Sequence, residues 1–122
     1  MMVRINDFYN DCLSRMSSHQ AVECCQERFD ITEAYVGQAR KVMQKISDSR
    51  LNNQIICELL DDQRISADTF LTIAQCAEAN GRSANLDGFL EEILNDLAIP
   101  ISDKERRLSK GQFKKWRERT GL

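Results

Sequence analysis

The side chains best suited to metal or nucleophilic chemistry are five cysteines and one histidine, His19. A structural zinc site usually takes cysteines about two residues apart, so that two thiolates converge on one tetrahedral ion. Cys24 and Cys25 are adjacent instead, and adjacent side chains on a helix point about 100° apart. The other cysteines, Cys12, Cys57 and Cys76, stand singly. We therefore expect no metal site, and we interpret the cysteines as small apolar residues in a reducing compartment.

Catalysis by a cysteine or serine would need a base, and His19 is the only imidazole in the chain. His19 lies five and six residues before Cys24 and Cys25, which is not the spacing of neighbours on a helix face. The glycines are isolated, so the chain has no glycine-rich loop to hold a phosphate. These patterns predict a protein without catalytic residues or a cofactor. An enzyme that pairs His19 with Cys24 or Cys25 stays an alternative.

Acidic residues form two further groups: Glu58, Asp61 and Asp62, and Glu91, Glu92 and Asp96. Paired carboxylates can hold Mg²⁺ or act in hydrolysis. Both groups lie opposite the apolar stripes of their predicted helices, which is typical of solvated helix faces. We interpret them as solvated faces.

Charge changes along the chain at Pro100. Residues 1–100 contain 9 Lys and Arg against 16 acidic residues, whereas residues 101–122 contain 8 against 3. The formal net charge of −2 therefore combines an acidic part with a basic end. Such an asymmetry is a functional clue, because a single segment can then meet a partner of opposite charge. We predict an acidic helical bundle over residues 1–100 and a basic helical extension over residues 101–122, packed on or appended to the same domain.

The basic end also carries Phe113 and Trp116 at the spacing of neighbours on a helix. Three interpretations are open for it. In the first, the cations bind nucleic-acid phosphates. In the second, the aromatic pair enters a groove of a partner protein. In the third, the basic helix folds onto the acidic residues 1–100 and neutralises them. The predicted contact residues are Arg106, Arg107, Lys110, Phe113, Lys114, Lys115, Trp116, Arg117 and Arg119.

The environment of Trp116 distinguishes a binding segment from a packed one. An anchor for a partner stays partly exposed in the free protein, whereas a tryptophan of the core is buried. Phe113 and Trp116 are the only large apolar residues of this helix and lie among like charges. That composition favours the exposed anchor.

Apolar residues recur every three or four positions along most of the chain, which predicts helices and no strand. In the first half of the chain we expect a helical face over residues 5–16, a helix capped at Ser17-Ser18, a helix that starts from a capping box at Asp30–Glu33, and a helix over 51–60. In the second half we expect a helix from Ser66 to Asn80-Gly81 and a helix over 86–97 ended by Pro100. Further helix starts are expected at Ser102 and Ser109. Residues 54–70 also have the spacing of helix, turn, helix, but Asp61, Asp62 and Asp68 would face DNA with like charge. We expect an ordinary helical hairpin there.

The length of 122 residues suits one domain. We predict an all-α, single-domain bundle of about six main helices plus short basic C-terminal helices. The predicted core contains Phe8, Cys12, Met16, Phe29, Val42, Ile46, Ile55, Leu59, Phe70, Ile73, Phe89, Ile93 and Leu97.

We expect a non-catalytic, cytoplasmic regulator, inhibitor or adaptor that acts through a protein partner. A nucleic-acid-binding regulator that uses residues 101–122 is the alternative. The chain shows neither the apolar run of a secretory signal nor the ~20 apolar residues of a membrane span, so no membrane contact is expected. The wide apolar seam over residues 86–97 could serve a homodimer as well as a core.

Overall fold

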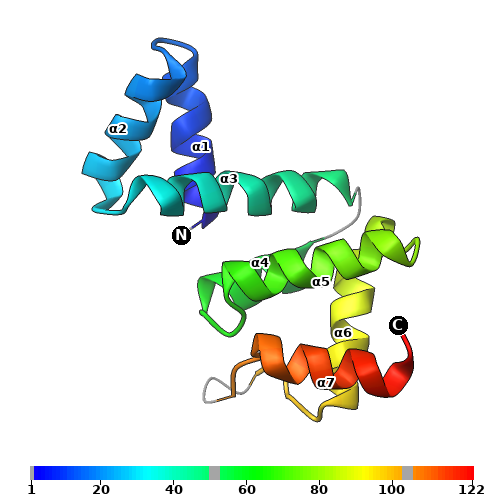
Figure 1. The fold of residues 1–122 in the computed structure, drawn as a ribbon. Helices are drawn as coiled ribbons and strands as arrows, with labels where there is room; N and C mark the ends of the chain where they lie inside the picture. The colour runs from blue at the N-terminus through cyan, green and yellow to red at the C-terminus, as the bar shows by residue number, and fades with distance from the viewer. Residues whose placement is uncertain (1, 50–52, 103–105) are drawn as a thin grey trace. The chain divides into compact units, whose positions relative to one another are not determined.

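The computed structural model describes residues 2–49, 53–102 and 106–122 (Figure 1). Their helices are α1 (Met2–Leu13), α2 (Ser18–Phe29), α3 (Glu33–Asp48), α4 (Gln54–Asp61), α5 (Ala67–Ala79), the 3-10 helix η1 (Ser83–Asn85), α6 (Leu86–Asp96) and α7 (Lys110–Thr120). In this part of the chain, extended backbone pairs only at an isolated parallel bridge between Ile65 and Leu108. The all-α prediction is confirmed.

The chain divides into two compact units, Met1–Gln44 (unit 1) and Lys45–Leu122 (unit 2). Unit 1 contains α1, α2 and most of α3, and unit 2 contains α4 to α7. The change of charge at Pro100 falls inside unit 2, so the basic segment belongs to the same unit as α4, α5 and α6. The predicted partition into an acidic bundle and a basic extension stays a prediction.

Unit 1 is held together by a small apolar cluster. α1 packs against α2, and the buried cluster consists of Tyr9, Cys12, Ala21, Cys25 and Val36. At its margin, the rings of Phe8 and Phe29 meet edge to face with centroids 5.7 Å apart. The guanidinium carbon of Arg40 lies 4.0 Å from the centroid of the Tyr9 ring. This cation–π contact adds a polar cover to a small core.

Unit 2 is organised around α6, which contacts α4, α5 and α7. The apolar stripe of α6 is at most 3% exposed and consists of Leu86, Phe89, Leu90, Ile93 and Leu94. Its own neighbours in the chain therefore cover the seam that the sequence also offered to a homodimer. The seam is a core face.

Several predicted helix signals are confirmed. Ser17, Ser66 and Ser109 are N-caps whose side chains accept hydrogen bonds from backbone N–H groups three residues later. Gly81 adopts φ 69° directly after Asn80, the C-cap of α5, a conformation that glycine takes without a steric penalty. For the helix start predicted at Ser102, the residues that follow it, 103–105, lie outside the described residues, and so does the predicted helical position Leu51.

The boundary predicted at Asp30 is wrong. Asp30 ends α2 as its C-cap, with φ 53° in the left-handed region. The start of α3 is marked instead by Thr32, whose hydroxyl accepts a hydrogen bond from the backbone N–H of Tyr35 at 3.2 Å. Aspartate is tolerated both as an N-cap and in the left-handed conformation of a C-cap. The spacing to Glu33 alone therefore predicted an N-cap where the structure has a C-cap.

Pro100 does not end α6. The helix ends at Asp96, and Ala98 turns the chain at φ 53°. The backbone N–H of Ile99 then donates to the carbonyl of Leu94 at 2.8 Å. This left-handed turn satisfies a terminal carbonyl before the proline is reached.

Five residues of the predicted core are only partly buried: Phe8, Met16, Phe29, Ile55 and Leu97. Met16, Phe29 and Leu97 lie at or beyond the ends of their helices and Ile55 in the first turn of α4, where fewer neighbours cover a side chain. The buried members are Cys12, Val42, Ile46, Leu59, Phe70, Ile73, Phe89 and Ile93. Sequence periodicity located the helix faces well and their margins poorly.

Candidate binding surface on helix α7

Local signals define α7 at both ends. Ser109 and Gln112 form a capping box, with the backbone N–H of Gln112 donating to the Ser109 hydroxyl at 3.2 Å and the backbone N–H of Ser109 donating to Gln112 Oε1 at 2.9 Å. Gly121 ends the helix at φ 76°, and its N–H donates to the carbonyl of Arg117 at 3.0 Å. A highly charged segment therefore has a defined helical geometry.

The aromatic residues of α7 face the core of unit 2. Phe113 is 1% exposed and Trp116 is 3% exposed. The Trp116 ring stacks on Phe113 and meets Phe89 edge to face, with centroid distances of 6.0 Å and 5.8 Å. The expectation that Trp116 is a partly exposed anchor is wrong. Both aromatic side chains fix α7 to unit 2 and are unavailable to a partner in this conformation.

The indole N–H of Trp116 donates to Asp96 Oδ2 at 2.8 Å. Asp96 belongs to the acidic group that the sequence placed on the solvated face of residues 86–97. Part of that group is therefore used to satisfy a buried donor, as a buried tryptophan requires. A second member, Glu92, forms an ion pair with Arg82.

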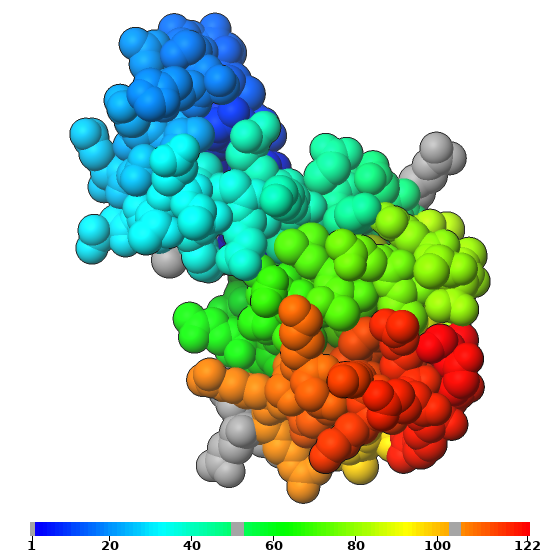
Figure 2. All heavy atoms as spheres, viewed as in Figure 1, coloured from blue at the N-terminus to red at the C-terminus, as the bar shows by residue number. Residues whose placement is uncertain are grey.

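The cations of α7 point away from this core. Lys110, Lys114, Lys115, Arg117 and Arg119 are all exposed. The residues coloured orange to red form a continuous stretch of surface in Figure 2. Lys110 Nζ lies 3.6 Å from Asp68 Oδ2, and among the described residues it is the one cation of α7 paired with an Asp or Glu side chain. Arg117 donates from Nε to the Leu122 oxygen at 3.1 Å, within the same segment. The geometry thus gives little support to neutralisation of α7 by the rest of the chain.

The two arginines before α7 are also exposed. Arg106 donates from Nη1 to the carbonyl of Ala98 at 2.8 Å, and this contact ties it to the turn after α6. Arg107 lines a cleft at the start of α7. The structure therefore places the predicted site residues in two groups, seven exposed cations and two buried aromatic side chains.

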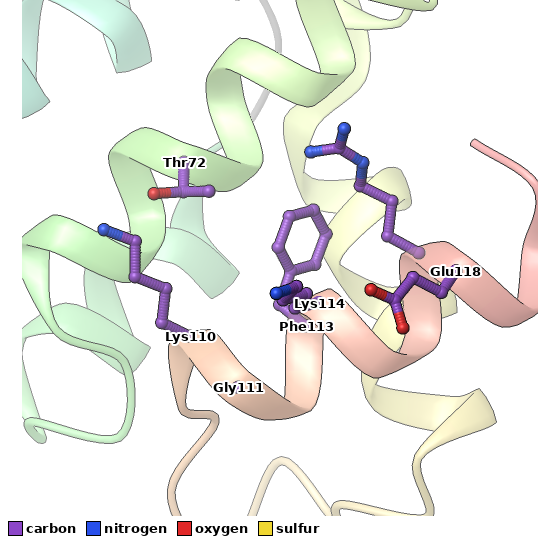
Figure 3. Close-up of a pocket in the computed structure, with 7 residues that line it drawn as sticks. Thr72, Lys110, Gly111, Phe113, Lys114 and Glu118 are labelled. Atoms are coloured by element: carbon purple, nitrogen blue, oxygen red, sulfur yellow. The ribbon is translucent and has the colours of Figure 1, made fainter.

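A groove of about 470 Å³ runs beside α7 (Figure 3). The Phe113 ring, which is 1% exposed, lies beneath this groove between α7 and Thr72 of α5, and cationic side chains stand around it. The lining residues are Thr72, Lys110, Gly111, Phe113, Lys114, Arg117 and Glu118. The groove combines apolar surface with three cations and one carboxylate, which suits an acidic segment that also carries an apolar side chain.

A second cleft, of about 380 Å³, lies where α5 and α7 begin. It is lined by Gln63, Arg64, Ser66, Asp68, Thr69, Arg107, Leu108, Ser109 and Lys110. Arg64, Ser66, Asp68 and Ser109 were not predicted from the sequence as members of a site. A signal was present, because the pattern arginine, aliphatic residue, serine occurs both at 64–66 and at 107–109, each time directly before a helix.

The sulfur and imidazole groups do not form a reactive pair in this structure. Cys25 is fully buried, Cys24 donates from its thiol to the Met16 sulfur at 3.6 Å, and His19 Nε2 lies 3.0 Å from Glu23 Oε1. Burial raises the pKa of the thiols of Cys24 and Cys25. A raised pKa disfavours the thiolate, which is the nucleophilic form.

Within residues 2–49, 53–102 and 106–122, no three metal-ligating side chains of His, Cys, Asp or Glu come together. In the same part of the chain, no helix has both the length and the apolar character to cross a bilayer. Comparisons with protein-family models, curated proteins and solved structures give no match to this chain.

Proposed function

We propose that this protein is a non-catalytic interaction protein, a regulator, inhibitor or adaptor, whose binding surface is the cationic side of α7. The partner it suits is a protein segment that is acidic and carries an apolar side chain. The observation that supports this proposal is the separation on α7 between a buried aromatic face and an exposed cationic face beside a groove.

The buried face gives the surface its rigidity. Phe113 and Trp116 pack into unit 2 and hold α7 in place, so a partner would not have to order the helix on binding. Preorganisation of this kind lowers the entropic cost of association. The exposed cations would steer an acidic segment toward the groove and set its register.

The groove favours a peptide over a phosphate backbone. The methyl group of Thr72 and the aliphatic parts of the Lys110, Lys114 and Arg117 side chains add apolar surface to the groove, and a sugar-phosphate chain makes no use of such surface. An acidic peptide can place an apolar side chain against it and its carboxylates against Lys110, Lys114 and Arg117.

Nucleic-acid binding is the second candidate. The observation that favours it is the run of exposed cations that continues from Arg106 and Arg107 into α7. Phosphate contacts made by these side chains would release counterions and give a steep dependence of affinity on salt. Unlike the peptide proposal, this one needs no contribution from the groove.

The test compares the two ligands on the full chain. Fluorescence anisotropy is measured with an acidic peptide that contains leucine and phenylalanine, and with a single-stranded oligonucleotide of equal charge, each over a series of salt concentrations. We expect saturable binding of the peptide and much weaker, strongly salt-dependent binding of the oligonucleotide. Tight binding of the oligonucleotide alone would replace the proposed function by the second candidate.

A charge variant locates the surface. Four exposed cations of α7 are changed to glutamine: Lys114, Lys115, Arg117 and Arg119. The matched control changes four exposed cations of unit 1: Arg4, Arg15, Arg28 and Lys41. We expect the α7 variant to lose peptide binding at an unchanged melting temperature and the control to retain it. Equal loss in both variants would show that net charge, not α7, attracts the peptide.

A further inference from the structure

The cleft at the start of α5 and α7 has a construction that the proposed function does not use. Ile65 and Leu108 form the parallel bridge, and the backbone N–H of Leu108 donates to the carbonyl of Arg64 at 2.9 Å. Side chains alternate along extended backbone, and Ile65 and Leu108 are both buried. The residues on either side of them, Arg64 with Ser66 and Arg107 with Ser109, all line the cleft.

Two helices begin at this bridge. Ser66 caps α5 and Ser109 caps α7, and each hydroxyl accepts the third backbone N–H of its helix. The earlier N–H groups, those of Ala67 and Asp68 in α5 and of Lys110 and Gly111 in α7, precede the first amide that a helix itself satisfies. The positive ends of two helix dipoles therefore lie at one cleft, and such ends attract anions.

Arg64 is an independent sign that the cleft receives an anion. Its side chain is 3% exposed, and its Nε has no hydrogen-bond partner. Its Nη2 donates to the carbonyl of Pro100, and the described residues supply it with no carboxylate. A buried guanidinium without an anion is costly, because its charge is desolvated and uncompensated.

Charge within the cleft is predominantly positive. Arg64, Arg107 and Lys110 oppose a single carboxylate, that of Asp68. Asp68 lies 3.6 Å from Lys110 and is exposed, so it stands at the rim and not at the wall that holds Arg64. The cleft thus offers several cationic and amide donors and one carboxylate.

We propose that this cleft binds a single phosphate group, as inorganic phosphate or a phosphate monoester. A monoester carries close to two negative charges and three terminal oxygens, which match two arginines and the free amides of two helix starts. A phosphodiester strand fits poorly, because it would have to pass Asp68 and the exposed Asp61 and Asp62 at the C-terminal end of α4. The site shares Lys110 with the groove of the proposed function, but Arg64 and Arg107 line the cleft alone, so the phosphate proposal does not depend on peptide binding.

The test follows the backbone amide resonances of the full chain during titration with inorganic phosphate, with chloride as the control for ionic strength. We expect saturable shifts at the amides of Ala67, Asp68, Lys110 and Gly111. O-phosphoserine should produce the same shifts, whereas a phosphodiester oligonucleotide should not compete for them. Shifts that follow chloride as well as phosphate, or that never saturate, would overturn the proposal.

Surface variants make the test specific without disturbing the buried Arg64. Arg107→Gln should weaken phosphate binding about tenfold, the usual effect of losing one charged hydrogen-bond partner. Asp68→Asn should strengthen it several-fold, because a competing carboxylate is removed. Lys115→Gln is the matched control, since Lys115 is exposed on α7 and lines neither the groove nor the cleft. Equal weakening by Lys115→Gln and Arg107→Gln would mean diffuse attraction to α7 and would overturn the assignment.

Discussion

Trp116 is held by Phe89, by Phe113 and, through its indole nitrogen, by Asp96. Replacing it by alanine would leave a large cavity in unit 2 and a carboxylate without its donor. We expect Trp116→Ala to lower the free energy of unfolding by about 3–5 kcal/mol. Trp116→Phe keeps much of the packing and loses the hydrogen bond, which costs about 1 kcal/mol. Urea denaturation followed by far-UV circular dichroism measures both.

The neighbouring Lys115 provides the control for Trp116. Its side chain is exposed, so Lys115→Ala should change stability by no more than about 0.5 kcal/mol. An unchanged denaturation midpoint for Trp116→Ala, combined with loss of peptide binding, would reinstate the exposed-anchor interpretation of this residue.

Ala98 occupies a backbone conformation that suits glycine. Its φ of 53° lies in the left-handed region, where a Cβ atom costs roughly 1–2 kcal/mol. Glycine removes that cost and adds a smaller entropic one, so Ala98→Gly should raise the free energy of unfolding by about 0.5–1 kcal/mol. Thermal melting checks the sign. Ala79→Gly, at an exposed position in the last turn of α5, should instead be destabilising.

At the scale of elements, the start of α4 depends on another helix. Asn53 is its N-cap residue but makes no side-chain capping bond. The backbone N–H of Ile56 donates instead to Asp87 Oδ1 of α6 at 3.3 Å. Burial raises the pKa of Asp87, and hydrogen bonds from Ile56 and Ile55 only partly offset this. The cap is therefore supplied by a desolvated carboxylate.

The direction of this pKa shift sets a pH dependence. The pKa of Asp87 is higher in the folded state than in the unfolded state, so the folded state binds the proton more tightly. Proton binding therefore stabilises the folded protein at low pH, and this stabilisation is lost as pH rises through the folded-state pKa. Asp87→Asn keeps an acceptor oxygen and removes the ionisation. We expect the free energy of unfolding of Asp87→Asn, relative to that of the wild type, to increase as pH rises. Urea denaturation at several acidic pH values measures this difference.

Asp87→Ala separates the cap from the charge. It removes the acceptor as well, so we expect a loss of about 1 kcal/mol under acidic conditions, where the wild-type carboxyl is protonated. Parallel stability curves for the wild type and Asp87→Asn would show that the Asp87 carboxyl titrates alike in both states.

Local signals predicted many element ends and missed others for a definable reason. Ser17, Ser66 and Ser109 act through backbone N–H groups three residues away, so the sequence window contains the whole interaction. Asp87 acts across 31 positions, and Asp96 meets Trp116 across 20. Such contacts depend on how helices pack, and no local pattern encodes them.

At the scale of the whole molecule, each of the two units has its own core. Trp116 lies in unit 2, and the buried Tyr9 lies in unit 1. Because the units carry separate cores, we expect them to unfold in separable steps. In Tyr9→Ala, part of the far-UV circular dichroism signal, that of unit 1, should be lost at a lower denaturant concentration. The transition followed by tryptophan fluorescence, which reports on unit 2, should stay unchanged. Identical shifts of both transitions would show a single cooperative unit.

The sequence by itself determined the helical class, most helix faces and the concentration of positive charge after Pro100, because periodicity, capping and charge are properties of short windows. The tertiary structure decided what those helices do. It turned Phe113 and Trp116 inward because the α6 stripe offered them a core. It also brought Arg64 and Arg107 to one cleft through a bridge between Ile65 and Leu108. Residues 43 positions apart in the sequence meet there because two helices begin side by side, a pairing set by packing.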